Sequence, residues 1–145
     1  MRSLFVVVLC VALSACSRVG SLVIINNLGA LVSLQSVVTV DEHGLDVAAY
    51  GWPKGLRLPD RSRTKQLLDE HSGWRLQLRA GSCRFWYFIP QPQEIGEFNY
   101  PDTVVQLNND GAFYLVGRRD YGSERYVQIA AQGFPVFPLR NSCDQ

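Results

Sequence analysis

Apolar and polar residues alternate strictly in one stretch of this chain. In residues 74–79, apolar side chains alternate with Arg75, Gln77 and Arg79. A period of two places the apolar side chains on one face of a β-strand and the polar ones on the other. The stretch therefore predicts a half-buried strand with one face in water. Residues 81–82 then turn the chain into 83–89, its most apolar predicted strand.

Turn-forming residues join other apolar runs in pairs. Residues 22–25 and 31–40 are apolar runs on either side of an Asn-Asn-Leu-Gly turn, and this pattern predicts a β-hairpin. Residues 103–107 and 112–116 flank an Asn-Asn-Asp-Gly turn, which is typical of a second hairpin.

The remaining segments have weaker patterns. Residues 45–52 and 125–130 predict two further strands, and 53–60 and 133–138 predict irregular or extended chain. Residues 61–70 contain good helix formers without a sustained helical period, so we expect a short helical turn or an exposed loop there.

These elements predict an all-β fold with little helix. Short strands at regular spacing are typical of a small antiparallel β-sandwich or barrel of about seven to eight strands. No linker or repeat divides the sequence. We therefore expect a single β-sandwich domain over residues 22–145.

The N-terminus departs from this pattern. Arg2 is followed by ten uncharged apolar residues, 4–13. This run is too short to cross a bilayer as a helix, which needs about 20 residues. It has the length of the apolar region of a secretory signal peptide.

Residues 13–16, Leu13-Ser14-Ala15-Cys16, resemble the lipobox of bacterial lipoproteins. In that family, the signal peptide is removed just before the cysteine, which then becomes lipid-modified. The resemblance implies a signal peptide at 1–15, lipidation of Cys16 with palmitate, and a lipidated tether at 16–21. The alternatives are an ordinary signal peptide, with Cys16 incidental, and an uncleaved N-terminal anchor.

The same resemblance bears on localisation. Ser17 follows the lipid site, and a residue other than Asp there implies the outer membrane of a Gram-negative host, with the domain facing the periplasm. The whole chain of 145 residues has a formal charge of +1. Removing 1–15 takes away Arg2, which leaves a neutral chain. We therefore expect a lipid-anchored cell-envelope protein that does not bind nucleic acid.

Removal of the signal peptide would leave the four cysteines with different roles. Cys10 would be removed with the signal peptide and Cys16 would carry the lipid. Cys83 and Cys143 would then remain as a pair in an oxidising compartment. We expect a disulfide between them, closing a loop of about 60 residues. Free thiols are the alternative.

Sequence motifs for catalysis and metal binding are missing. The chain contains no GxSxG, GxGxxG, GxxxxGK or HExxH motif and no CxxC spacing. Its two histidines, His43 and His71, stand in polar, turn-like stretches. We expect no enzyme activity, no cofactor and no metal.

The aromatic residues indicate a possible binding surface, whereas the sequence motifs indicate no catalytic site. Phe85 and Tyr87 cannot share a strand face with Trp86 and Phe88, so one pair is expected in the core. The other pair lies either on an exposed binding surface or beneath the loop at 91–102. The residues expected to face a partner are Tyr50, Trp52, Trp86, Glu94, Glu97, Phe98 and Tyr100. Glu94 and Glu97 could also form an acid–base pair, although ordinary surface charge is the simpler interpretation.

Three functional hypotheses follow. The first is a non-enzymatic interaction or accessory subunit of an envelope assembly, bound to the membrane through its lipid and to a protein partner. The second is an inhibitor or immunity lipoprotein against a periplasmic hydrolase. Small disulfide-bearing β lipoproteins that inhibit lysozymes are similar in size, but their C-terminal motif is not matched convincingly by residues 110–114. The third is a glycan-binding module that uses Trp52, Trp74 or Trp86.

Overall fold

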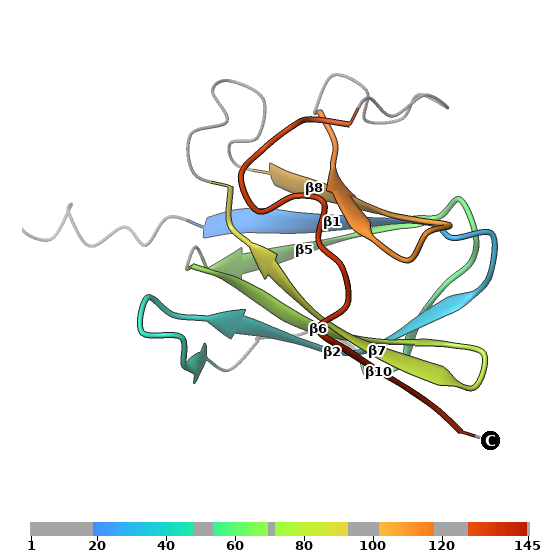
Figure 1. Cartoon of the computed structure of the whole chain (residues 1–145). Coiled ribbons are helices and arrows are strands. Elements are labelled where there is room, and N and C mark those ends of the chain that lie inside the picture. The colour runs from blue at the N-terminus through green and yellow to red at the C-terminus, as the bar shows by residue number, and fades with distance from the viewer. Residues whose placement is uncertain (1–18, 48–53, 70–71, 93–101, 118–127, 145) are drawn as a thin grey trace, which may run out of the picture.

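The computed structural model describes residues 19–47, 54–69, 72–92, 102–117 and 128–144 (Figure 1). These residues form ten β-strands and no helix, which confirms the predicted all-β fold. The strands are β1 (Val19–Asn27), β2 (Val32–Val40), β3 (Asp46–Val47), β4 (Leu56–Leu58), β5 (Arg63–Asp69), β6 (Gly73–Ala80), β7 (Cys83–Pro90), β8 (Asp102–Asn108), β9 (Phe113–Leu115) and β10 (Arg140–Cys143).

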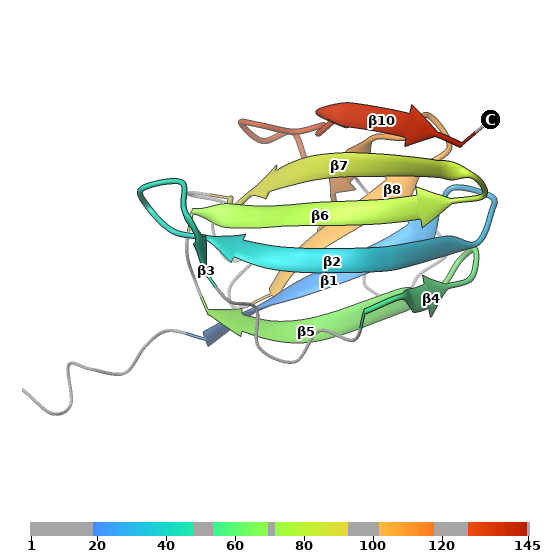
Figure 2. The same ribbon diagram turned by 90° about the horizontal axis from the view of Figure 1, so that it is seen from below.

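The strands form two sheets that pack face to face. One sheet has the order β5-β1-β8-β9, and the other has the order β10-β7-β6-β2-β3, with β4 also paired to β2. Figure 1 shows the two layers from the side, and Figure 2 looks onto the six-stranded sheet with β10, β7, β6 and β2 side by side. The pairs are antiparallel except β1 with β8, which run parallel.

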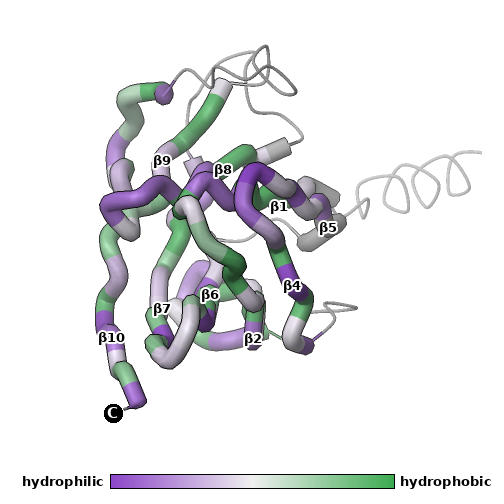
Figure 3. The backbone as a smooth tube through the Cα atoms, turned by 90° about the vertical axis from the view of Figure 1, so that its right-hand side faces the viewer, coloured by the Kyte–Doolittle hydropathy of each residue, from purple (hydrophilic) through white to green (hydrophobic). Residues whose placement is uncertain are grey.

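Hydrophobic stretches, green in Figure 3, lie on both sheets, and their buried side chains form the main hydrophobic core. Leu22 and Ile24 of β1 meet the inward residues of β6 and β7 there. Tyr87 of β7 packs edge-on against Phe113 of β9, with ring centroids 4.9 Å apart. This aromatic contact joins the two sheets directly.

A second buried cluster lies on the other face of the four-stranded sheet. Val23 and Ile25 of β1 alternate with the core residues and are themselves buried, together with Val104 and Val116. β1 is therefore buried on both faces. A strand of this kind lacks the apolar–polar alternation of a half-exposed strand, and residues 22–25 of β1 accordingly form a continuous apolar run.

The hairpin predicted from residues 22–25 and 31–40 is wrong. β1 and β2 lie in different sheets, because the turn between them carries the chain from one layer to the other. Asn26 stabilises this crossing: its Nδ2 donates to the carbonyls of Ala30 and Leu58, both at 2.8 Å. The neighbours of β1 are instead β5 and β8.

Two further predictions need correction. In the stretch 61–70, expected to be a helical turn or an exposed loop, residues 63–69 instead form β5, which pairs with β1 over seven residues. The stretch 53–60, expected to be irregular, contains the short strand β4. In both segments, pairing with a neighbouring strand outweighs the weak local preference of the sequence.

The other two predicted hairpins are confirmed. β6 and β7 pair through the turn at Gly81 and Ser82, and β8 and β9 pair through the turn at 109–111. Gly81 has φ of 60° and Gly111 has φ of 78°, which lie in the left-handed region that favours glycine. These turns depend on residues close together in sequence, so the local pattern was sufficient to predict them.

Candidate functional site

Most of the residues expected to face a partner lie outside the described part of the chain. They are Tyr50, Trp52, Glu94, Glu97, Phe98 and Tyr100, and the predicted lipidation site Cys16 lies outside it as well. Cys83, Cys143 and Trp86 are described, and all three lie on β7 or β10. The candidate site is therefore built from these two strands outward.

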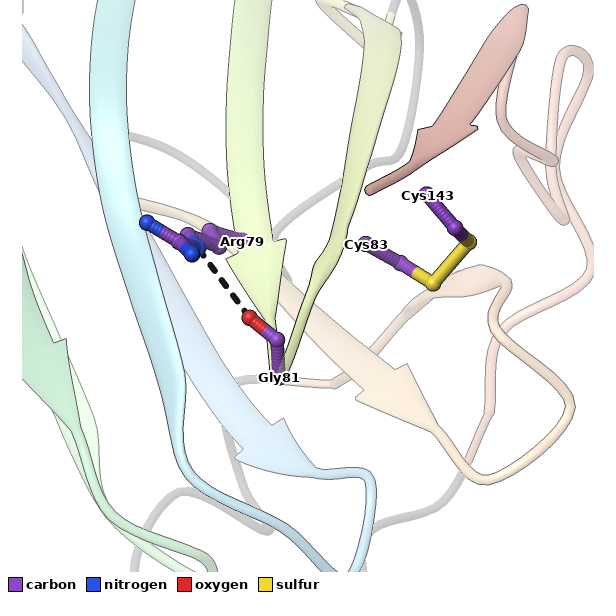
Figure 4. Close-up of a disulfide and its surroundings, with 4 residues drawn as sticks. All are labelled: Arg79, Gly81, Cys83 and Cys143. Carbon is purple, nitrogen blue, oxygen red and sulfur yellow. Dashed lines mark hydrogen bonds between the residues drawn. A yellow bond between two sulfur atoms is a disulfide. The ribbon is translucent and has the colours of Figure 1, made fainter. Parts of the chain in front are cut away.

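The predicted disulfide between Cys83 and Cys143 is present. The two residues are direct partners in the antiparallel pair of β7 and β10, with their Cα atoms 3.9 Å apart (Figure 4). β10 is the last strand in the described chain, and all four of its residues are exposed. The bridge thus fixes an exposed edge strand to the six-stranded sheet.

The outer face of this sheet carries polar and aromatic side chains. Trp74, Leu76 and Leu78 of β6 point into the core, so Arg75 and Gln77 point outward. The prediction that the aromatic residues of β7 divide between two faces is borne out, because Tyr87 is buried in the core and Trp86 opposes the outward Gln77. We call the side chains of Arg75, Gln77, Arg79, Arg84, Trp86, Phe88 and Arg140 the outer face.

Trp86 lies in the middle of this face, and Arg140 stands beside it on the edge strand β10. They are direct partners across β7 and β10, and the Arg140 Cζ lies 3.9 Å from the centroid of the indole ring. This distance allows a cation–π interaction, worth about 0.5–1 kcal/mol at an exposed site. The backbone N–H of Leu139 also donates to the Trp86 carbonyl at 2.7 Å. The segment entering β10 is thus held against Trp86.

A hollow of about 370 Å³ opens beside this pair. Its outward-facing lining comes from β2, β3, β6, β7 and β10, and it includes one carboxylate: Ser36, Val38, Asp46, Arg75, Gln77, Trp86 and Arg140. Leu139 adds an apolar rim, with 72% of its surface exposed. The hollow therefore combines an aromatic ring, guanidinium groups and apolar contact surface.

Carboxylates from this chain meet two of the arginines. The Arg75 guanidinium pairs with Asp46 and also donates to the Gly44 carbonyl at 3.1 Å. Arg84 lies 3.7 Å from a carboxylate oxygen of Asp144. These ion pairs lie toward opposite edges of the sheet, on β3 and just beyond β10. Carboxylates thus already contact this face at two separate places.

Arg79 donates from Nε to the Gly81 carbonyl at 3.0 Å within its own hairpin (Figure 4). Among the described residues, the Arg140 guanidinium meets the Trp86 ring and no oxygen acceptor. No oxygen of the described residues therefore occupies its five N–H donors.

The groups with shifted pKa values lie beside the turn between β8 and β9. Burial raises the pKa of Tyr87 to about 12, and the Asp110 carboxylate adds to this effect. The Tyr87 hydroxyl donates to the Gly111 carbonyl at 2.8 Å. At neutral pH the phenol is thus protonated and ties β7 to this turn.

The exposed Asp110 carboxylate stabilises the same turn by accepting hydrogen bonds. Hydrogen bonds from the Tyr114 hydroxyl at 2.5 Å and the Ala112 N–H at 3.0 Å lower the pKa of its carboxyl. The bond to Asp110 in turn raises the pKa of Tyr114. Burial thus accounts for most of the Tyr87 shift, and hydrogen bonds within the turn account for those of Asp110 and Tyr114.

The part of the chain that is described contains no group of three or more His, Cys, Asp or Glu side chains arranged to hold a metal ion. Within that same part, no helix is long and apolar enough to span a membrane.

Sequence reasoning missed Arg140 and Leu139, although a signal for Arg140 was present. If Cys83 and Cys143 are direct partners in an antiparallel pair, the residue three places before Cys143 must face the residue three places after Cys83. Arg140 and Trp86 occupy those positions. The predicted disulfide, combined with strand register, could therefore have placed Arg140 beside Trp86.

Comparison with known proteins assigns neither a family nor a function to this chain. No protein-family model, no curated protein and no solved structure matches this chain.

Proposed function

We propose that this chain is a lipid-anchored protein of the cell envelope that binds a protein partner through the outer face of its six-stranded sheet. It would act without catalysis, as an interaction or accessory subunit of an envelope assembly. The lipobox at residues 13–16 supports the anchoring. In a Gram-negative host, the domain would lie at the outer membrane and face the periplasm.

One observation carries the binding part of the proposal: the two sheets differ on their outward sides. The four-stranded sheet buries Val23, Ile25, Val104 and Val116 there, whereas the six-stranded sheet has an open hollow lined by Trp86 and Arg140. Tryptophan and arginine are enriched among the residues that dominate binding energy at protein interfaces. This composition favours the outer face as the interaction surface.

The glycan-binding alternative has less support from the tryptophans described. Trp74 is only 2% exposed and belongs to the core. Trp86 has one ring face covered by Arg140, and a sugar would need a free ring face on which to stack. Trp52 lies outside the described residues.

The start of β1 bears on how the domain would sit at a membrane. β1 begins at Val19, within the segment expected as a tether and three positions after Cys16. Three extended residues span roughly 10 Å. A lipid on Cys16 would therefore hold the sandwich close to the bilayer surface, where a membrane-bound partner could reach it.

Two experiments test the proposal. Labelled palmitate should be incorporated by the parent protein and by Cys10→Ala, and should be lost in Cys16→Ser. Incorporation in Cys16→Ser would refute the acylation site.

For the binding surface, a photo-crosslinking residue at Gln77 should give a discrete protein adduct in native cells. The same probe at Asn109, an exposed turn position on the other sheet, is the control. Equal adducts from both positions, or none from Gln77, would count against the outer face. If the purified protein inhibits a periplasmic hydrolase in proportion to its concentration, the inhibitor hypothesis replaces the subunit hypothesis.

A further inference from the structure

The Arg140 guanidinium is positioned to recognise an anionic group. Its side chain is exposed on β10, which the disulfide holds in register with β7, and it rests on the Trp86 ring. Contact with an aromatic ring leaves the N–H donors of a guanidinium for other acceptors. A carboxylate can accept two parallel hydrogen bonds from such a group.

Charge on the outer face favours a carboxylate as that acceptor. The face carries four arginines, Arg75, Arg79, Arg84 and Arg140. The only carboxylates that the described residues place against it are Asp46 and Asp144, toward the two edges of the sheet. Asp46 pairs with Arg75 and Asp144 with Arg84, so Arg79 and Arg140 have no carboxylate partner among the described residues. The face therefore keeps excess positive charge, and an acidic ligand would complement it.

The surroundings of Arg140 favour a protein segment as the source of the carboxylate. Phe137 and Leu139, just before β10, have 58% and 72% of their surfaces exposed. Large exposed apolar side chains beside tryptophan and arginine are typical of a protein interface.

We infer that the outer face binds an extended acidic segment of the protein partner, with Arg140 as the anchor for one of its carboxylates. This inference rests on the proposed function and specifies the chemistry of the partner. An extended segment that crosses the strands at Arg140 would pass over Trp86 and Gln77. The other arginines flank this path, with Arg84 and Arg79 in the cross-strand row on one side and Arg75 in the row on the other. Leu139 and Phe137 would contact its apolar side chains.

A fluorescein-labelled peptide of four Glu-Ser repeats is a suitable probe. In an extended chain, its carboxylates lie on one side, about 6.8 Å apart. The full chain in detergent micelles should raise the fluorescence anisotropy of this peptide and leave that of the matching Gln-Ser peptide unchanged. High salt should weaken the interaction, because exposed charges are screened.

Substitutions localise the binding. Arg140→Gln should weaken it about tenfold or more, since a charge-assisted bidentate contact is lost. Arg140→Lys keeps the positive charge but lacks the planar guanidinium group, so it should lose less affinity for the peptide. Arg61→Gln is the matched control: it removes the same charge from a turn residue whose side chain is 88% exposed. It should change the affinity less than twofold.

Three outcomes would overturn the inference. The first is equal binding of the two peptides, and the second is an equal effect of Arg140→Gln and Arg61→Gln on the affinity. The third is that polygalacturonate displaces the labelled peptide at a lower concentration of carboxylate groups than the unlabelled peptide does. The last would assign the surface to an acidic glycan. Failure of the proposed function is seen separately, in the palmitate and photo-crosslinking experiments, which do not use this peptide.

Discussion

Removing the disulfide tests what holds the C-terminal strand in place. The bridge joins Cys83 to Cys143, 60 positions apart. In the chain-entropy description, closing a loop of that length stabilises the folded state by about 4 kcal/mol, because the unfolded chain loses conformational freedom. For a domain of this size, this corresponds to a fall in Tm of about 15 °C. We expect this loss in the variant with Cys83→Ser and Cys143→Ser.

A truncation separates this effect from the native contacts of β10. A chain that ends at Leu139 and carries Cys83→Ser lacks both the bridge and the strand. The residues of β10 are exposed, and the strand pairs with β7 over only four residues. Its own contribution should therefore be small, about 1 kcal/mol from hydrogen bonds and cross-strand contacts. The truncated chain should be only that much less stable than the double-serine variant.

Urea unfolding measures both differences. Trp74 is buried in the core, so its fluorescence should report global unfolding. Linear extrapolation gives the free energy of unfolding, and the parent protein with reductant should match the double-serine variant. A double-serine variant within 1 kcal/mol of the parent would refute the loop-closure reasoning. A truncation that costs 3 kcal/mol more than the double substitution, as an order-of-magnitude threshold, would show that native contacts of β10 dominate.

Three further substitutions test the packing and the hydrogen bonds, each by urea unfolding. Gly73→Ala should cost about 1–3 kcal/mol, because the added Cβ would lie 2.5 Å from the Ile89 carbonyl oxygen; no loss would contradict this contact. Tyr87→Phe should cost about 1 kcal/mol at neutral pH through its lost bond to the Gly111 carbonyl. The folded-state pKa of Tyr87 exceeds the ordinary value of 10, so the protonated hydroxyl contributes its full stabilisation of the fold below pH 10. This contribution declines as the pH rises toward 12, and Tyr87→Phe should lack the decline. Asn26→Ala should cost about 2–3 kcal/mol, because two carbonyls lose their donor, whereas a cost below about 1 kcal/mol would show that water replaces the amide.

Local sequence signals predicted the elements that depend on local contacts. The alternation in 74–79 gave the correct faces of β6, and the Asn-Asp-Gly turn gave the pairing of β8 with β9. In each case, the residues that determine the structure lie within one hairpin. Period-two patterning and left-handed glycines act over that range, so no knowledge of the rest of the chain was needed.

Pairings between distant segments were not predictable in the same way. β1 is buried on both faces, so its apolar run does not distinguish one neighbour from another. It pairs with β5 and β8, which follow it by about 40 and 80 positions. β5 was missed for a related reason: its strand conformation depends on β1 rather than on its own residues.

The candidate site was predictable in part. Alternation along β7 placed Trp86 on the face opposite Tyr87, and cysteine counting gave the disulfide. The contact of Arg140 with Trp86 required the register of β10 on β7, which neither pattern supplied alone. An edge strand of four exposed residues has no hydrophobic signature, so only the disulfide indicated its partner.

The placement of arginines on the outer face also bears on function. Arg79 and Arg84 are direct partners on β6 and β7, and both are exposed. Like charges directly opposite each other on a sheet destabilise it, by up to about 1 kcal/mol. Solubility does not require this arrangement, because charges of mixed sign would keep the face soluble without the repulsion. The Asp144 carboxylate beside Arg84 and the bond from Arg79 to the Gly81 carbonyl offset part of this repulsion. An unfavourable local arrangement of this kind is typical of a functional surface, and an acidic segment across the face would convert the repulsion into attraction. The pair therefore supports the same ligand chemistry as Arg140, from a different part of the sheet.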